Sequence, residues 1–385
     1  MDSPFIYDRS VTGKNFIGRK ADCAILSNLL RQGENVAIYE PPKTGKCSLI
    51  DQTLLNMRMS GGQFISGTFS VLNIRRPDDF AIALASALVR MVASSPDEYE
   101  RAVRQYLSGT SLVFDPARFS EFDEVVSKGW ELGENDYMEV FRMPYRMALD
   151  KGTRMILVIN EFQNIDLTGD GDSLIKGMER VMKEYPDPRK TGFSYIFSGS
   201  MVNAMKDIFE RRGSFYRNVE RLRLRDVDEK EISEHVVKGL LSSGKVIDRK
   251  LVLGACNLLR NNLWYINHFI AICDSKSKGY IMEPVLMEAL SSLLAIHSPR
   301  FVSTMNSLTT HQVALLGAIL DGCRKFSGLA VVQKYSLNSS ANVKRVKDAL
   351  MKKEIVAFED DETPVVLDPL FEYWARKYYF EKKEQ

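Results

Sequence analysis

The chain has few of the residues on which disulfide frameworks and many metal sites depend. Among 385 residues there are 5 Cys and 4 His, no two cysteines form a Cys-x-x-Cys pair, and no histidine shows ligand spacing. So few cysteines cannot crosslink a chain of this length as they do small secreted domains. We expect reduced thiols in a cytoplasmic protein, and a metalloenzyme is disfavoured. The cysteines are Cys23, Cys47, Cys256, Cys273 and Cys323.

The sequence also lacks long apolar runs and an excess of charge of one sign. No stretch approaches the roughly 18 apolar residues of a membrane span, and we expect neither a signal peptide nor a membrane partner. Lys and Arg total 52 against 50 Asp and Glu, a formal net charge of +2. A nearly neutral chain has no global field for nucleic acid, so such a partner would need a local basic patch. No Gly-x-Ser-x-Gly nucleophile elbow occurs, which disfavours a triad hydrolase.

What is present indicates a core-forming α/β protein of two or three domains. Hydrophobic residues make up 45% of the chain and charged residues 26%. Short apolar runs alternate with segments of helical periodicity, the order of a doubly wound parallel sheet. We predict strands at residues 35–39, 64–72, 154–159, 193–197 and 219–224. Together they define an α/β domain over residues 1–225.

Two further regions follow this domain, and one insertion interrupts it. Residues 94–135 form an insertion, predicted to be a solvated helical elaboration, with nine acidic and four basic side chains between residues 97 and 134. Residues 226–300 read as a helical lid with helices at 229–241, 249–259, 264–273 and 283–295. Residues 301–385 show three helices and then a two-stranded hairpin, which is the winged-helix order. The first of these helices opens on Thr309 with Gln312 three residues later, a capping-box pattern.

The strongest motif is the turn at residues 40–48, Glu-Pro-Pro-Lys-Thr-Gly-Lys-Cys-Ser, between a strand and a helix. It approximates the P-loop pattern Gly-x4-Gly-Lys-Ser/Thr, in which backbone N–H groups cradle phosphates. Gly45 and Lys46 stand where the pattern requires them. However, Glu40 replaces the first glycine, and Cys47 replaces the hydroxyl residue that binds Mg²⁺. We predict a phosphate-binding loop, with Pro42, Lys43, Thr44 and Ser48 completing the cradle.

A second motif ends the apolar strand at residues 154–159. Asn160 and Glu161 follow it, where P-loop ATPases of this arrangement carry Asp-Glu. The Asp supports Mg²⁺ and the Glu orients or deprotonates the attacking water. Glu161 is therefore the candidate catalytic base, and its position at a strand end favours this role over helix capping.

With these motifs in their observed order, the chain resembles the AAA+-type archaeal-ATPase family of P-loop proteins, relatives of origin-recognition ATPases with a C-terminal winged helix. The resemblance extends over nearly the whole chain. It is carried by Phe-Ile-Gly-Arg at 16–19, the P-loop at 41–46, Asn-Glu-Phe-Gln at 160–163, Phe-Ser-Gly-Ser-Met at 197–201 and Asp-Pro-Leu-Phe at 368–371.

The resemblance implies roles for several residues. Phe16, Gly18 and Arg19 would lie near the adenine of ATP or ADP, and Ser198 would be the polar sensor at the end of the fourth strand. Arg217 would be an arginine finger, although a surface arginine in a basic loop explains it equally well. No arginine matches the second sensor of many AAA+ proteins. In the lid, Trp264 and Tyr265 are expected to pack in a core rather than to stack on a base.

The departures from the motifs weaken metal binding more than nucleotide binding. Mg²⁺ prefers oxygen ligands, so the Cys47 thiol and the neutral Asn160 are both poor metal positions. The backbone cradle and Lys46 remain. We expect a nucleotide-dependent switch with weak or absent ATP hydrolysis; Glu161 leaves slow turnover open. The alternatives are a scaffold that has lost nucleotide binding and a DNA-associated ATPase.

The C-terminal region has the third winged-helix helix that commonly reads DNA. There Lys344, Arg345 and Lys347 are candidate phosphate contacts. The predicted wing, however, carries four acidic residues at 359–362, and residues 309–385 hold 12 basic and 11 acidic side chains. DNA binding is therefore disfavoured. The alternative is a winged helix that contacts the ATPase core or a protein partner, and the lid is a second candidate surface for such a partner.

Overall fold

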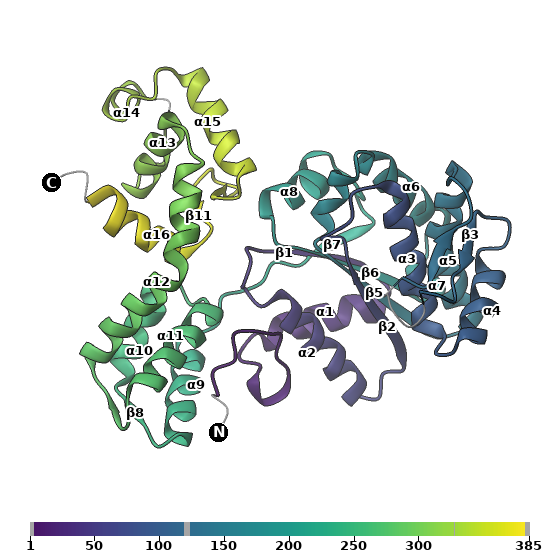
Figure 1. Cartoon of the computed structure of the whole chain (residues 1–385), viewed down its shortest axis with the longest axis horizontal. Helices are drawn as coiled ribbons and strands as arrows, with labels where there is room; N and C mark the ends of the chain where they lie inside the picture. Colours follow the sequence, from purple (N-terminus) through teal and green to yellow (C-terminus); the bar gives the residue numbers. More distant parts are fainter. Residues whose placement is uncertain (1–3, 119–123, 327, 382–385) are drawn as a thin grey trace. The chain divides into compact units, whose positions relative to one another are not determined.

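The computed structural model describes residues 4–118, 124–326 and 328–381. The chain divides into two compact units (Figure 1). The sheet unit comprises residues 20–40 and 49–224. The lid–winged-helix unit comprises residues 1–19, 41–48 and 225–385, so the predicted phosphate-binding loop belongs to it. No helix among the described residues is long and apolar enough to cross a membrane.

The sheet unit is built on five parallel strands in the order β2-β5-β6-β1-β7. Their bounds are β1 (Asn35–Tyr39), β2 (Phe64–Ser70), β5 (Arg154–Asn160), β6 (Phe193–Gly199) and β7 (Val219–Arg221). In β1, β5 and β6 almost every residue is buried, as expected for central strands covered on both faces. This confirms the predicted α/β class with a parallel sheet.

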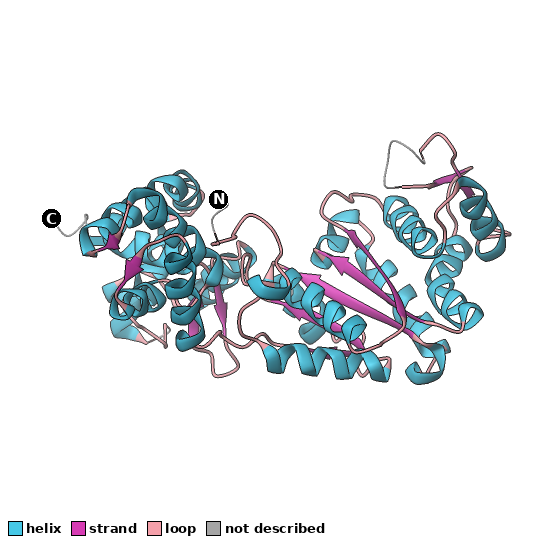
Figure 2. Ribbon diagram, turned by 90° about the horizontal axis from the view of Figure 1, so that it is seen from below, coloured by secondary structure: helices cyan, strands magenta, loops and turns pink. Residues whose placement is uncertain are grey.

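Helices cover this sheet on both sides, as Figures 1 and 2 show. Helix α3 starts with Pro77 directly after the extended residue Arg76, a favoured helix opening. Apart from α4 (Pro96–Tyr106) in the insertion, the helical segments up to β7 are η1 (Gly13–Asn15), α1 (Lys20–Gln32), α2 (Lys46–Met59), α3 (Pro77–Val92), α5 (Glu134–Lys151), η2 (Phe162–Thr168), α6 (Gly171–Glu184), α7 (Pro188–Thr191), α8 (Val202–Lys206) and η3 (Asp207–Arg211).

The insertion differs from the predicted helical elaboration. Within its described residues, 94–118 and 124–135, the only complete helix is α4 (Pro96–Tyr106), and α5 begins at Glu134; β3 (Leu112–Phe114) and β4 (Val126–Lys128) form an antiparallel pair. The pair is held against α3 by a buried hydroxyl, because Ser86 Oγ accepts hydrogen bonds from the N–H groups of Val125 and Val126, both at 3.1 Å. Helical periodicity could not indicate this partner, which lies about forty residues away in the chain.

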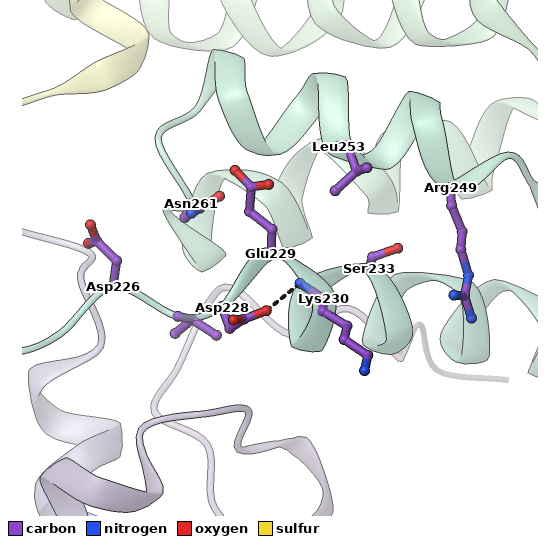
Figure 3. A pocket seen from close by; sticks show the side chains of 9 residues that line it. Asp226, Asp228, Glu229, Lys230, Ser233, Arg249, Leu253 and Asn261 are labelled. Atoms are coloured by element: carbon purple, nitrogen blue, oxygen red, sulfur yellow. Dashed lines mark hydrogen bonds between the residues drawn. The ribbon is translucent and has the colours of Figure 1, made fainter.

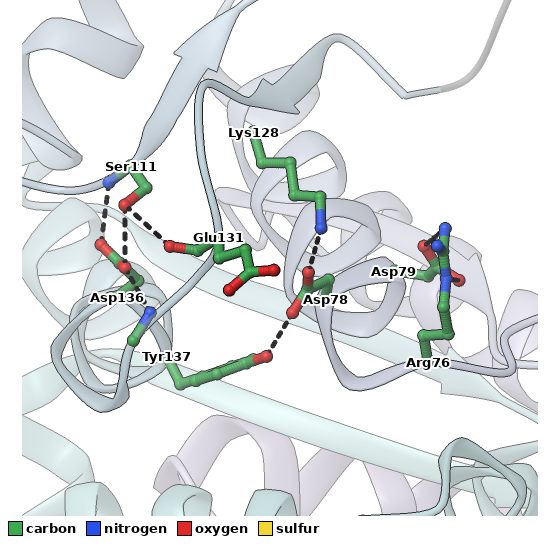
Figure 4. A network of polar contacts seen from close by, with 9 residues as sticks. Arg76, Asp78, Asp79, Ser111, Lys128, Glu131, Asp136 and Tyr137 are labelled. Atoms are coloured by element: carbon green, nitrogen blue, oxygen red, sulfur yellow. Dashed lines mark hydrogen bonds and ion pairs between the residues drawn. The ribbon is translucent and has the colours of Figure 1, made fainter.

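Polar contacts anchor the same hairpin to α3 and α5 (Figure 4). The buried Asp136 carboxylate accepts hydrogen bonds from Ser111 N at 2.8 Å and from Ser111 Oγ at 3.0 Å. Nearby, Asp78 accepts from Lys128 and from the Tyr137 hydroxyl. Partial burial raises the pKa of Asp78, but these two hydrogen bonds outweigh it and hold the pKa below its usual value.

The lid consists of four helices and a short strand pair that the sequence did not predict. The helices are α9 (Glu229–Ser242), α10 (Arg249–Leu258), α11 (Leu263–Lys276) and α12 (Glu283–Asn306); β8 (Val246–Ile247) pairs in parallel with β9 (Tyr280–Ile281). Helix α12 continues past its predicted end at residue 295 and runs through residue 300. The domain boundaries at 225 and 300 remain predictions.

The C-terminal region has the predicted three helices and hairpin. They are α13 (Thr310–Leu320), α14 (Leu329–Lys334), α15 (Ser340–Lys352), β10 (Val356–Phe358) and β11 (Pro364–Val366), followed by α16 (Pro369–Trp374) and η4 (Ala375–Phe380). The capping box of Thr309 and Gln312 is formed. One hydrophobic cluster extends from Phe5 and Val236 to Leu350 and Trp374, so the lid and this region share a core.

Candidate nucleotide site

The predicted phosphate-binding loop joins the end of β1 at Tyr39 to the start of α2 at Lys46. Two of its residues, Lys43 and Gly45, have left-handed backbones with φ of 66° and 88°. The Thr44 hydroxyl and the Lys46 ammonium both donate to the Pro41 carbonyl, at 2.8 and 2.9 Å. The loop is therefore a tight turn with Lys46 at a helix N-terminus, where backbone N–H groups and the helix dipole favour anions.

The N-terminal motif lies against this loop and against the lid. Gly18 has φ of 67°, and a Cβ atom there would be 2.7 Å from Val227 Cγ1. A Cβ atom on Gly45 would be 3.4 Å from a terminal nitrogen of Arg19, which puts the Arg19 guanidinium beside the loop. Phe16, in the same motif, is partly buried. The structure thus places the Arg19 guanidinium, next to Gly18 in the chain, beside the loop; the family resemblance implied that both residues lie near the nucleotide.

The two residues after Lys46, Cys47 and Ser48, are poorly suited to bind a magnesium ion. Cys47 is exposed, and Ser48 Oγ accepts a hydrogen bond from Val11 N at 3.1 Å. In the sheet unit, Asn160 Nδ2 donates to Thr68 Oγ1 at 3.1 Å. A thiol is a poor match for the oxygen ligands that Mg²⁺ prefers, and the Asn160 amide lacks the negative charge of the aspartate usual at this position. Across the described residues, no group of three or more His, Cys, Asp and Glu side chains could hold a metal ion.

Glu161 is fixed by two neighbours at the carboxyl ends of β5 and β6. It has a left-handed backbone with φ of 53°. Its Oε2 accepts hydrogen bonds from Ser200 Oγ at 2.5 Å and from Gln163 Nε2 at 2.6 Å. Such a conformation is uncommon for a residue other than glycine, and it is often found at functional sites. Ser198, predicted as the polar sensor, is buried at 3% exposure.

The hydrogen bond between Ser200 and Glu161 is a structural detail of the candidate site that the sequence analysis did not predict. Ser200 lies in the motif at residues 197–201, but only Ser198 was assigned a role. The strand pairing supplies the signal, because Asn160 on β5 is in register with Ser198 on β6. The residues that follow the two strands, Glu161 and Ser200, therefore leave the sheet at the same edge.

Arg217, the candidate arginine finger, is exposed and follows the exposed Tyr216. Both Phe215 and Arg217 have positive φ, 60° and 63°, and the guanidinium carbon of Arg217 lies 5.2 Å from the Tyr216 ring centroid. Phe215 is buried at 1% exposure and anchors the turn. This geometry is compatible with either role, so the arginine finger stays a prediction.

A cavity of about 660 Å³ lies in the lid, at the start of α9 and α10 (Figure 3). Asp226, Asp228 and Glu229 contribute carboxylates to its lining, and Lys230 and Arg249 contribute cations. Three carboxylates repel a polyphosphate, so this cavity does not compete with the loop as a phosphate site. The rest of its lining is Val227, Ser233, Leu253 and Asn261.

The side chain of Lys43 connects the loop to two aromatic rings of the lid, a contact that the P-loop pattern could not predict. Its ammonium nitrogen lies 3.6 Å from the ring centroid of Trp264 and 5.5 Å from that of Tyr265. Burial, and then the charge of Arg300, lower the pKa of Lys43 to about 8. Tyr265 is fully buried, as expected for core packing, whereas Trp264 is only partly buried and presents its ring to the loop.

The basic residues of α15 are divided between solvent and the wing. Lys344 and Arg345 are exposed. Lys347 instead lies over the Phe358 ring at 3.8 Å and pairs with Glu362 at 3.5 Å. The acidic wing therefore engages one of the three candidate DNA contacts.

Comparisons with known proteins agree with this architecture. A family model described as "probable winged helix domain" matches residues 299–377. No curated protein sequence matches the chain. Among solved structures, the Walker-type ATPase PABY2304 of Pyrococcus abyssi is similar at TM-score 0.68 and 14% identity, covering 97% of this chain and 99% of that one. The ADP form of the Aeropyrum pernix ORC2 protein is similar at TM-score 0.54 and 12% identity, covering 95% and 93%.

The ORC2 protein with ADPNP and ADP is also similar, at TM-score 0.53, 12% identity and 97% and 98% coverage. At these identities the likeness concerns the fold. The parallel sheet, the position of the loop between β1 and α2, and the C-terminal match agree with the sequence motifs. The chain therefore has the fold of the AAA+-type P-loop ATPases, with a C-terminal winged-helix domain.

Proposed function

We propose that the protein binds ATP or ADP through the loop at residues 41–48 and acts as a nucleotide-dependent switch with weak or absent hydrolysis. The observation that carries the proposal is the geometry of the loop: a strand, a turn with two left-handed residues, and a helix that starts at Lys46. The similar ORC2 structures, which were solved with ADP and ADPNP, support it.

Binding would replace contacts that the loop now makes with itself. Lys46 is 7% exposed, and its ammonium donates to the Pro41 carbonyl. A phosphate oxygen offers a charged acceptor in place of that neutral carbonyl, and charge-assisted hydrogen bonds are the stronger kind. The Thr44 hydroxyl can keep its bond to Pro41 and so maintain the turn.

Weak hydrolysis follows from the metal-facing positions. When bound, Mg²⁺ supplies charge neutralisation to phosphoryl transfer. The Cys47 thiol is a poor ligand for it, and Asn160 lacks the negative charge of an aspartate. Glu161 is the one acidic residue of its motif that is retained, and Ser200 and Gln163 orient its carboxylate. We expect this carboxylate to support slow turnover at most.

The winged-helix domain is proposed to contact a protein partner rather than DNA. Lys344 and Arg345 are exposed and could meet phosphates, but Lys347 is paired with Glu362 of the acidic wing. The cytoplasm is the proposed compartment, since none of the five cysteines is in a disulfide.

Isothermal titration calorimetry with ATP tests the proposal. Lys46→Ala is expected to weaken ATP binding at least tenfold, because it removes the charged donor to the phosphates. Lys176→Ala is the matched control, since Lys176 is an exposed lysine on α6. Binding that is equal in wild type and Lys46→Ala would contradict the proposed site. No ATP binding by the wild type would favour the scaffold alternative.

A further inference from the structure

Lys43 extends from the phosphate-binding loop into an aromatic cluster of the lid. Its ammonium lies over the Trp264 ring at 3.6 Å, a distance at which cation–π attraction is strong. Trp264 is at the second position of α11, next to Tyr265. Both aromatic residues and Lys43 belong to the lid–winged-helix unit.

The cluster around this contact contains two neutral histidines. The Tyr7 ring stacks on His268 at a centroid distance of 4.2 Å, and His297 lies 5.7 Å from Trp264. His268 Nδ1 and His297 Nε2 are buried and have no hydrogen-bond partner. Burial, followed by the charge of Lys43, lowers the pKa of His268 and brings that of His297 to about 4. Lys43, not a histidine, therefore carries the positive charge at the Trp264 ring.

A continuous set of contacts leads from this cluster to the winged-helix domain. The Tyr265 hydroxyl donates to Asp368, with both oxygen–oxygen distances at 2.9 Å. Arg300 on α12 donates to Asp368 at 2.7 Å. Asp368 Oδ1 also caps α16, accepting hydrogen bonds from Leu370 N at 3.0 Å and Phe371 N at 3.1 Å.

We propose that Lys43 and Trp264 form a latch that positions the phosphate-binding loop and couples phosphate binding to α11 and α16. Lys43 holds a left-handed backbone that a lysine does not favour. Attachment of its side chain to the lid stabilises that conformation, and with it the turn around the Pro41 carbonyl. The positioning role rests on the proposed nucleotide binding, whereas the latch itself does not.

The latch is expected to depend on the charge of Lys43. The titratable and charged groups around it lie on the N-terminal segment, α11, α12 and the cap of α16: Tyr7, Tyr265, His268, His297, Arg300 and Asp368. Arg300 opposes the charge of Lys43 and Asp368 favours it. Raising the pH above about 8 neutralises the ammonium and removes the cation–π attraction.

The first test needs no nucleotide. The four histidine ring signals are followed by NMR titration in the full-length wild type and in Lys43→Met. The variant is expected to raise the pKa values of His268 and His297, because a nearby positive charge is removed. His235 is the internal control: its pKa is lowered by burial and raised by its contact with Asn267, and Lys43 plays no part. Unchanged titration of His268 and His297 would overturn the latch.

The second test measures ATP affinity by calorimetry. Lys43→Met and Trp264→Leu are each expected to weaken ATP binding about fivefold, and the double variant no more than either alone. Lys43→Arg keeps a cation over the ring and should retain affinity. It should also retain affinity at pH 9.5, where the wild type weakens.

The two tests distinguish the latch itself from its role in positioning the loop for nucleotide binding. Additive losses in the double variant, or equal affinity of Lys43→Met and wild type, would overturn the positioning role. Failure of the wild type to bind ATP at all would overturn the proposed function, and with it the positioning role. In that case the histidine titration still decides whether the latch exists.

Discussion

At the scale of single residues, Gly18 shows how a backbone requirement and a close approach combine. Its φ is 67°, and a Cβ atom would come within 2.7 Å of Val227 and 2.9 Å of Glu231 Oε2. Gly13 has nearly the same backbone, with φ of 62°, but a Cβ atom there would have no neighbour within 4 Å. An alanine at either position would have the same unfavourable backbone conformation, but only at Gly18 would its Cβ atom also clash with neighbouring side chains.

Gly18→Ala is expected to reduce the free energy of unfolding by about 2–4 kcal/mol, and Gly13→Ala by about 1 kcal/mol. The difference arises because a Cβ atom at Gly18, unlike one at Gly13, would meet Val227 and Glu231 of the lid. Urea unfolding followed by circular dichroism gives both values. Equal losses in the two variants would show that N-terminal packing against α9 contributes nothing.

The two proposed metal positions, Cys47 and Asn160, allow a gain-of-function prediction. Combining Cys47→Thr with Asn160→Asp supplies a hydroxyl and a carboxylate, the ligands that Mg²⁺ prefers. We expect Mg²⁺-dependent phosphate release to rise at least tenfold above wild type, and to be lost again when Glu161→Gln is added. A steady-state phosphate assay measures this. Brisk Mg²⁺-dependent hydrolysis by the wild type would contradict the account of these positions.

At the scale of elements, the insertion is organised by buried polar contacts rather than by periodicity. Asp136 is 7% exposed and joins the start of α5 to Ser111, next to β3. Asp79 makes an ion pair with Arg76, whose side chain is 71% exposed. The first kind of contact is far costlier to remove than the second.

Asp136→Ala is therefore expected to lower the unfolding free energy by about 2–4 kcal/mol, since it leaves buried donors unsatisfied. Asp79→Ala is the control, with an expected loss of about 0.5 kcal/mol. Chemical denaturation compares them. A small effect of Asp136→Ala, similar to that of the control, would mean that the hairpin is held by its apolar contacts alone.

The elements also show what could be predicted from the sequence. The strands predicted at 35–39 and 154–159 could be found because buried parallel strands are apolar runs, and Thr309 with Gln312 predicted a helix start. The strands β3 and β4 and the pairing of β8 with β9 were not predicted. Strands of two or three residues have too little pattern, and tertiary contacts decide their conformation.

At the scale of the whole molecule, the motifs predicted the fold but not the partners of the loop. Gly45 and Lys46 are adjacent residues of one short motif, so the loop could be recognised from the sequence. The contact of Lys43 with Trp264 joins residues more than two hundred positions apart, and no periodicity reports it. Periodicity likewise does not report the hydrogen bond between Ser200 and Glu161, which follows from the register of β5 and β6.

Acid stability is a further property of the lid–winged-helix unit. Burial lowers the pKa values of His235, His268 and His297, the last to about 4 from 6.5. Below pH 6.5 the unfolded chain binds protons that the folded unit does not. Folding stability is then expected to fall as the pH drops from about 6.5 towards 4.

Denaturation with urea at several pH values measures this loss. His297→Gln is expected to reduce the slope of stability against pH in that range, because one titrating group is removed. His311→Gln, at a partly exposed position on α13, is the control. A slope that does not change in His297→Gln would contradict the neutral state of this histidine.

The central claim is that a backbone cradle and Lys46 bind nucleotide without help from a metal. Calorimetric titration of the wild type with ATP, in excess Mg²⁺ and in excess EDTA, tests it most directly. We expect two dissociation constants within about threefold of each other, because the Cys47 thiol is a poor metal ligand and Asn160 lacks the negative charge of an aspartate. Binding that is present in Mg²⁺ and lost in EDTA would contradict it.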